Sequence, residues 1–292
     1  MKLFNRDIVT LNIEATEARL LIINHGRIVR WDSIALPAGA MRGGQVAMPA
    51  ELGRALNELF DRCRAARQSV VVGLNGQRSL VRIFNLPPVD AKLLDETIRR
   101  EARRELPLPL DELYLTWQLL AAAPAAARPV FVLGIPRETI DTCLTALRVA
   151  NVRPAAMDLK PLALARAVNL PDVLIADAEA ATQEVIVVRG GVPISVRSIG
   201  LAQPARPPGD QADALAIEVQ RTLDFYQSSM AAGRPPWTPV VCLTGLVGED
   251  EVVRQAIGAR WPLVQPAPAV VLPAALPGLV YLTNLGLALK KA

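Results

Sequence analysis

Few residues in this sequence have the types and spacing that catalysis or metal binding requires. The only histidine is His25, and the three cysteines, Cys63, Cys143 and Cys242, lie far apart in apolar surroundings. Catalytic triads and structural zinc sites need several such side chains close together, so neither is predicted. The sequence also lacks the G-x-x-x-x-G-K-[ST] phosphate loop and a G-x-G-x-x-G turn after a strand. Isolated cysteines fit a reducing compartment, and His25 is interpreted as a solvated turn residue.

The composition narrows the class of protein further. The 292 residues are 51% hydrophobic but only 4% aromatic, which is enough for two domains with cores of Ala, Leu and Val. The net charge is +4, yet the arginines are scattered among acidic residues, so we expect no nucleic-acid partner. Residues 263–289 carry no charge but contain four prolines, which predicts buried globular structure rather than a membrane helix. The polar N-terminal residues do not resemble a signal peptide, so we expect a cytoplasmic protein.

A pattern of short strands and one helix occurs twice along the chain. The first copy has strand-like runs separated by tight turns and then an amphipathic helix, at residues 9–13, 19–23, 28–36 and 49–67. The second copy has the same order at residues 173–176, 184–188, 193–199 and 214–230. Two copies of one supersecondary pattern predict a duplicated domain.

A smaller group of elements lies between the two copies. Residues 81–86 alternate like a strand that Pro87 and Pro88 end, and Asp90 is placed to cap a helix over residues 91–105. A second strand at 114–120, a third at 129–135 and a helix at 137–150 follow. We expect a small α+β module with Tyr114 and Trp117 in its core.

Residues 81–120, VRIFNLPPVDAKLLDETIRREARRELPLPLDELYLTWQLL, resemble the PilM family. Residues 131–168, 219–229 and 284–291 extend the resemblance over most of the chain. PilM proteins are actin-like cytoplasmic components of the type IV pilus inner-membrane platform. The resemblance implies an α/β, actin-like (ribonuclease H-like, duplicated) two-lobe fold with an inserted small α+β domain. The implied division is residues 1–78 and 154–170 for the first lobe, 79–153 for the inserted domain and 171–292 for the second lobe, with the C-terminal helix returning towards the first.

The same resemblance implies where a nucleotide would bind. In ATP-binding actin-like proteins, the first turn of each copy reads Asp-x-Gly and then Ser or Thr, because glycine lets backbone amides approach phosphate oxygens. Here the first turn has Asn12, Glu14 and Thr16 at these places. The second turn keeps Asp177 but has Glu179 instead of glycine, followed by Thr182. A glutamate 4 Å from a phosphate charge costs roughly 4 kcal/mol at an effective dielectric constant near 20.

The remaining family positions are altered as well. The third, glycine-rich turn retains Gly245, and Glu218 and Arg221 lie on the helix that approaches the nucleoside, where we interpret them as a solvated i,i+3 pair. We therefore expect a vestigial nucleotide cleft that binds neither ATP nor a metal ion and catalyses no reaction. Its residues would be Asn12, Thr16, Asp177, Thr182, Glu218, Arg221 and Gly245.

Three functional hypotheses follow from the resemblance. The first is a non-catalytic scaffold of a type IV pilus, or related secretion or competence, assembly machine. It would lie peripheral to the inner membrane and bind the cytoplasmic N-terminal tail of a PilN-like protein. Its other partners would be the pilus motor ATPase, platform proteins or a second copy. The alternative is an actin-like assembly protein controlled by ATP and Mg²⁺. The third, a kinase-like enzyme for sugars or acids, needs a phosphate-competent first turn, which Asn12 and Glu14 argue against. Nucleotide binding separates the first hypothesis from the other two.

Overall fold

The computed structural model describes residues 7–120, 128–201, 207–230, 236–268 and 270–290. The chain forms two compact units: unit 1 comprises Met1–Gln77 and Thr145–Ala292, and unit 2 comprises Arg78–Leu144, inserted between them. Unit 2 ends within helix α3 (Arg137–Val149), before the predicted domain end at residue 153. The second half of α3 belongs to unit 1 because Ala146 and Val149 pack closely over Gly53.

The first lobe of unit 1 is a five-stranded sheet in the order β10-β6-β1-β2-β3. Strands β1 (Ile8–Ile13), β2 (Glu17–Asn24) and β3 (Arg27–Ala35) form the predicted antiparallel meander. Strands β6 (Gln68–Leu74) and β10 (Arg153–Leu159) continue the sheet in parallel with β1. A two-stranded hairpin, β4 (Met41–Arg42) and β5 (Gln45–Val46), follows the meander. Helix α1 (Pro49–Cys63) contacts β2 and β3 and ends at Arg64, whose left-handed backbone stops it before residue 67.

The second lobe repeats this topology. Strands β11 (Val173–Ala178), β12 (Thr182–Arg189) and β13 (Val192–Gly200) form an antiparallel meander, and β14 (Val241–Thr244) lies parallel to β11. Helix α5 (Pro208–Phe225) packs on β11 and β12 and continues as a π-helical turn over Tyr226–Met230. It begins before residue 214 because Pro208 fits a first helical turn. Helices α6 (Gly245–Gly248) and α7 (Glu251–Gly258) complete the lobe. The repeated strand order confirms the predicted duplication.

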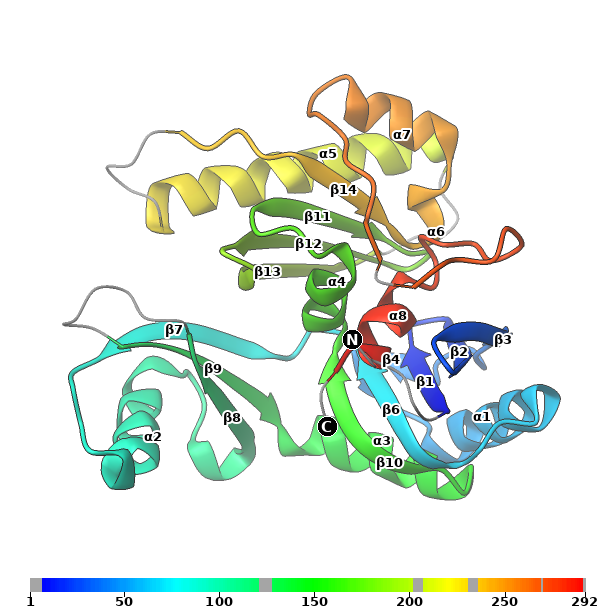
Figure 1. Ribbon diagram of the computed structural model, residues 1–292, viewed down its shortest axis with the longest axis horizontal. Coiled ribbons are helices and arrows are strands. Elements are labelled where there is room, and N and C mark those ends of the chain that lie inside the picture. The colour runs from blue at the N-terminus through cyan, green and yellow to red at the C-terminus, as the bar shows by residue number, and fades with distance from the viewer. Residues whose placement is uncertain (1–6, 121–127, 202–206, 231–235, 269, 291–292) are drawn as a thin grey trace. The chain divides into compact units, whose positions relative to one another are not determined.

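Two helices lie between the sheets of unit 1, namely α4 (Lys160–Val168) and α8 (Leu282–Ala288) (Figure 1). They share one apolar core with both sheets, which includes Leu21, Ile23, Leu164, Ile175, Ile186 and Leu285. The C-terminal helix α8 contacts β1, β2 and β6 of the first lobe. In the described residues, no helix is both long and apolar enough to cross a membrane.

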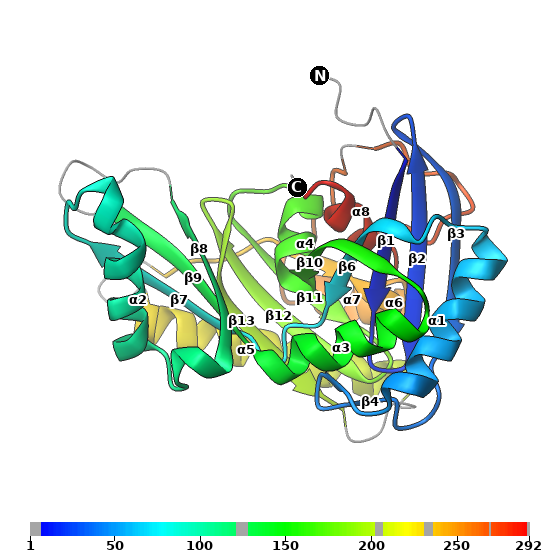
Figure 2. The same ribbon diagram turned by 90° about the horizontal axis from the view of Figure 1, so that it is seen from below.

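Unit 2 has a three-stranded antiparallel sheet in the order β7-β9-β8, against which helix α2 (Leu94–Glu105) packs (Figure 2). The strands are β7 (Leu80–Leu86), β8 (Leu113–Leu119) and β9 (Arg128–Pro136). Helix α2 (Leu94–Glu105) is preceded by the 3₁₀ turn η1 (Ala91–Leu93), and a second turn, η2 (Leu110–Glu112), precedes β8. The core contains Leu86, Leu94, Ile98, Ala102, Leu106, Leu113, Val130 and Val132.

Two sequence predictions for unit 2 were wrong in detail. Asp90 makes no side-chain capping bond, because the 3₁₀ turn separates it from the start of α2. Tyr114 is 40% exposed, since it lies on the sheet face away from α2, where Arg137 stacks on its ring. Trp117 packs at the edge of the core and donates a hydrogen bond to Asp95.

Candidate functional site

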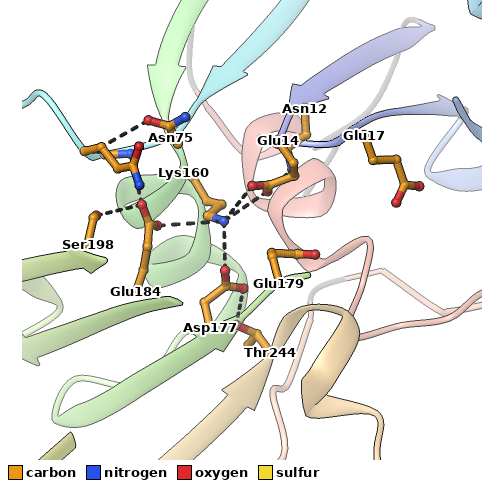
Figure 3. A network of polar contacts seen from close by, with 12 residues as sticks. Asn12, Glu14, Glu17, Asn75, Lys160, Asp177, Glu179, Glu184, Ser198 and Thr244 are labelled. Atoms are coloured by element: carbon orange, nitrogen blue, oxygen red, sulfur yellow. Dashed lines mark hydrogen bonds and ion pairs between the residues drawn. The ribbon is translucent and has the colours of Figure 1, made fainter. Parts of the chain in front are cut away.

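The turns that end β1 and β11 face each other at the centre of unit 1, and charged side chains fill the space between them. Six residues make up this inter-lobe ion network, and five of them are labelled in Figure 3. Lys160 is the first residue of α4, and Arg19 lies on β2. The four acidic members come from both lobes: Glu14, Asp177, Glu179 and Glu184. All six residues are at most 5% exposed.

The ammonium group of Lys160 lies at the centre of the network. Its Nζ donates to both carboxylate oxygens of Glu14 in the first lobe, at 3.0 and 2.9 Å. On the side of the second lobe it pairs with Asp177 Oδ2 at 2.8 Å and approaches Glu184 Oε2 at 3.9 Å. Figure 3 shows these carboxylates arranged around the ammonium group, with Glu14 from the turn after β1 and the other two from β11 and β12. Lys160 therefore connects the lobes electrostatically.

A second pair crosses between the lobes beside Lys160. The guanidinium group of Arg19 donates to both oxygens of Glu179, at 2.7 and 2.6 Å. This two-point geometry is the strongest form of an arginine–carboxylate pair. Arg19 also donates to the carbonyl oxygen of Val280 at 3.2 Å, which connects the pair to the segment before α8.

Neutral groups supply further hydrogen bonds to the acidic members. Asn12 Nδ2 donates to Glu14 at 2.8 Å, and the Thr244 hydroxyl donates to Asp177 at 2.7 Å. Glu184 accepts from the Ser198 hydroxyl at 2.8 Å and from the backbone amide of Gly76 at 3.1 Å. The amide of Gly76 belongs to the first-lobe segment after β6, so this bond also spans the lobes.

The network holds four carboxylates and two cations, so its charges do not balance when all groups are ionised. Burial would lower the pKa of Lys160, but Asp177, Glu14 and Glu184 outweigh it and keep that pKa well above its usual value. Burial would raise the pKa of Glu14, but Lys160 and Arg19 lower it. Burial raises the pKa of Glu179 to about 7 and also raises the pKa of Glu184.

This arrangement limits the chemistry that the site can perform. Because its pKa is held high, the Lys160 amine stays protonated and is neither a nucleophile nor a base. Among the described residues, no group of three His, Cys, Asp or Glu side chains is placed to hold a metal ion. The geometry is that of a buried electrostatic connection between two lobes.

The structure places the seven residues that were predicted from the sequence in four different surroundings. Asn12 and Asp177 belong to the ion network and its hydrogen bonds. Thr16 and Thr182 instead line a pocket of about 350 Å³, together with the loop after β3 and Gly200. Gly245 begins α6, and its positive φ of 81° brings its backbone against Ala178.

Glu218 and Arg221 are paired as predicted, but only Arg221 is exposed to solvent, because Glu218 is buried. Glu218 is 9% exposed and accepts from Arg221 at 2.7 Å. It also accepts from Arg197 of β13 at 2.8 Å, so the pair fixes α5 to the sheet.

Sequence reasoning identified Glu14 and Glu179 as obstacles to phosphate but did not identify their partners Lys160 and Arg19. Lys160 stands between Leu159 and Pro161 in an apolar stretch. A single lysine within a segment that is predicted to be buried could have indicated a buried ion pair, because lysine is almost never fully buried without a partner. Arg19 begins an apolar strand run in the same way.

Comparison with known proteins agrees with the sequence resemblance. Residues 7–196 match the family described as type IV pilus assembly protein PilM. The chain belongs to the PilM family. No curated protein matches the sequence significantly.

Solved structures that are similar to this PilM-family chain share its fold. A chain of a PilM–PilN type IV pilus biogenesis complex has a TM-score of 0.76 at 23% identity, with 98% of each chain covered. The ethanolamine utilization protein EutJ from Carboxydothermus hydrogenoformans has a TM-score of 0.58 at 10% identity, over 97% of this chain and 90% of that one. The cytoplasmic domain of EpsL, an inner-membrane component of the Vibrio cholerae type II secretion system, has a TM-score of 0.58 at 13% identity, over 98% and 97%. The predicted actin-like, two-lobe α/β fold is confirmed.

Proposed function

We propose that this PilM-family chain is a non-catalytic scaffold of a type IV pilus assembly machine, and that it binds the cytoplasmic N-terminal tail of a PilN-like membrane protein. Family membership supports the pilus assembly role, and the solved PilM–PilN complex supports the choice of partner. The proposal includes a peripheral position at the inner membrane, reached through partners. It also includes contacts with the motor ATPase, with other platform proteins and with a second copy of the chain.

The inter-lobe ion network carries the non-catalytic part of this proposal. A triphosphate between the two turns would meet Glu14 and Glu179, whose negative charges repel it and whose side chains fill the space near the backbone amides. Lys160 and Arg19 could attract phosphate, but both are already paired with carboxylates. A nucleotide would have to break these buried pairs, and breaking a buried pair costs roughly 3–5 kcal/mol. The residues present therefore do not fit Mg-ATP.

Thermal unfolding with and without millimolar Mg-ATP tests the absence of nucleotide binding. A ligand at 100 times its Kd adds about 2.7 kcal/mol, which would raise the Tm of this chain by roughly 5 °C. We expect no rise. A clear rise would favour the alternative, an ATP-controlled assembly protein.

Titration of the protein with a synthetic N-terminal tail peptide of its PilN-like protein tests the partner. We expect saturable binding by calorimetry, with a scrambled peptide of the same composition as the control. Equal responses to both peptides would contradict the scaffold proposal. The peptide also serves as the positive control for the Mg-ATP measurement, because it should raise the Tm of the same sample.

A further inference from the structure

Lys160 and Arg19 lie buried between the two lobes, beside the two turns where the family resemblance implies a nucleotide. Lys160 joins the lobes through α4, because it pairs with Glu14 in the first lobe and with Asp177 in the second. Arg19 joins them directly through its two bonds to Glu179. The cations and their carboxylates are nearly inaccessible to water. Charged groups in such surroundings interact strongly and are little affected by salt.

We infer that Lys160 and Arg19 act as internal cations that hold the two lobes of unit 1 together, so that the closed cleft is the resting state of the ligand-free protein. The inference rests on the part of the proposed function that states that no nucleotide binds between the lobes. Both cations belong to the folded chain, so closure of the lobes depends on no ligand concentration.

The sequence positions of the contacts support a role between the lobes rather than within one. Glu14 follows β1 and Arg19 lies on β2, both in the first lobe. Asp177, Glu179 and Glu184 belong to the first hairpin of the second lobe. Lys160 begins α4, which packs between the sheets, so loss of its charge affects both sides. Arg19 also pairs with Glu17 of its own strand at 3.4 Å, but its two shorter bonds, at 2.7 and 2.6 Å, go to Glu179 in the other lobe.

The test uses the full chain and removes the central cation. Lys160→Met keeps an apolar stem of similar length but leaves Glu14 and Asp177 buried without their cation. We expect its Tm to fall by roughly 6–10 °C. Lys160→Met/Glu14→Gln removes one charge of each sign, and we expect it to recover at least half of that loss. The matched control is Lys92→Met, because Lys92 is an exposed lysine of unit 2.

Hydrogen exchange distinguishes loss of lobe closure from general destabilisation. In Lys160→Met, backbone amides of residues 12–19 and 177–184 should exchange at least about tenfold faster, while residues 80–86 and 128–136 of unit 2 should not change. Glu14→Gln, which keeps the lysine and its pair with Asp177, should show the same local effect more weakly. If Lys160→Met does not fold, the exchange measurement on Glu14→Gln alone tests the inference.

Unchanged exchange at the two turns in both Lys160→Met and Glu14→Gln would overturn the inference, and so would an equal increase along the whole chain. These outcomes can be separated from failure of the proposed function. Failure to bind the tail peptide, with the expected exchange response, would contradict the scaffold proposal and support the internal cations. Normal peptide binding with unchanged exchange at the two turns would overturn only the inference that Lys160 and Arg19 hold the lobes together.

Discussion

The ionisation of three buried carboxylates, Glu14, Glu179 and Glu184, affects how the stability of unit 1 depends on pH. Glu14 has a lowered pKa because of Lys160 and Arg19, whereas Glu179 and Glu184 have raised pKa values because of burial. A raised carboxyl pKa means that the folded state binds a proton that the unfolded state has already lost. The folded state is therefore stabilised by the ionised form of Glu14 and by the protonated forms of Glu179 and Glu184.

Glu179 is predicted to make the protein more stable at mildly acidic pH than at pH 8. Its pKa of about 7 in the folded state lies above the usual 4.5, so its contribution to stability rises as pH falls from about 8 towards 5. We expect a gain of about 1–3 kcal/mol in wild type, and a smaller gain in Glu179→Gln, which cannot titrate. Urea denaturation at pH 8 and pH 5.5 measures both values.

The exposed Glu138 provides the control for this experiment, because Glu138→Gln should leave the pH dependence as in wild type. A wild-type protein that loses stability between pH 8 and pH 5.5 would contradict the prediction. Glu14 has a lowered pKa, so its stabilising contribution is lost only at pH values below its usual range.

Individual residues show what sequence alone could predict about the site. The unusual acids at the turns, Glu14 and Glu179, were recognised because a family pattern exists for those positions. The cations were not, because Lys160 is 146 positions from Glu14 and Arg19 is 160 positions from Glu179. No local spacing encodes a contact of that range; only the folded arrangement of two lobes brings these groups together.

At the scale of elements, the close packing of α4 against α8 brings the C-terminal helix into the core of unit 1. Gly286 permits this packing, because a Cβ there would lie 1.8 Å from the carbonyl oxygen of Ala163. No shift of a flexible side chain can relieve such a contact, since the neighbour is backbone. The two helices would have to move apart.

Gly286→Ala is therefore predicted to destabilise unit 1 by roughly 2–4 kcal/mol. Chemical denaturation of the full chain measures the change. Gly209→Ala is the matched control, because a Cβ at Gly209, in the first turn of α5, meets nothing within 4 Å. The control should be neutral or slightly stabilising. Equal stability of the two variants would mean that α8 does not need its close approach to α4.

Sequence patterns predicted the strands well and the helix ends less well. The meanders follow from alternation and turn residues, so β1, β2, β3 and their repeats lie close to the predicted positions. Helix α5 begins earlier than the predicted residue 214, because Pro208 is acceptable in a first helical turn. The exposed position of Tyr114 depends on which face α2 covers, and alternation alone does not specify that face.

At the scale of the whole molecule, units 1 and 2 have separate apolar cores. The core of unit 2 centres on Ile98, which is fully buried against β7, β8 and β9 residues. The insertion joins unit 1 through the segment after β6 and through α3. Damage to one core should therefore remain largely local.

Ile98→Ala is predicted to destabilise unit 2 by about 2–4 kcal/mol through loss of buried methyl groups. Hydrogen exchange should increase over residues 80–86, 94–105 and 113–119, with no change over residues 8–24 and 173–189 of unit 1. Arg103→Ala, on the exposed face of the same helix, should change neither unit. Faster exchange throughout the chain in Ile98→Ala would show that the units unfold together.

The inter-lobe ion network also has a consequence for synthesis of the chain on the ribosome. Glu14 and Arg19 are synthesised early. The partner of Arg19, Glu179, is synthesised 160 residues later. At about 5–20 residues per second this delay is roughly 8–30 s. During that time the nascent first lobe keeps its charges in water, because burying them without their partners is too costly. Joining of the lobes is thus a late event in biogenesis, and the charged groups that emerge first are among the last to be enclosed.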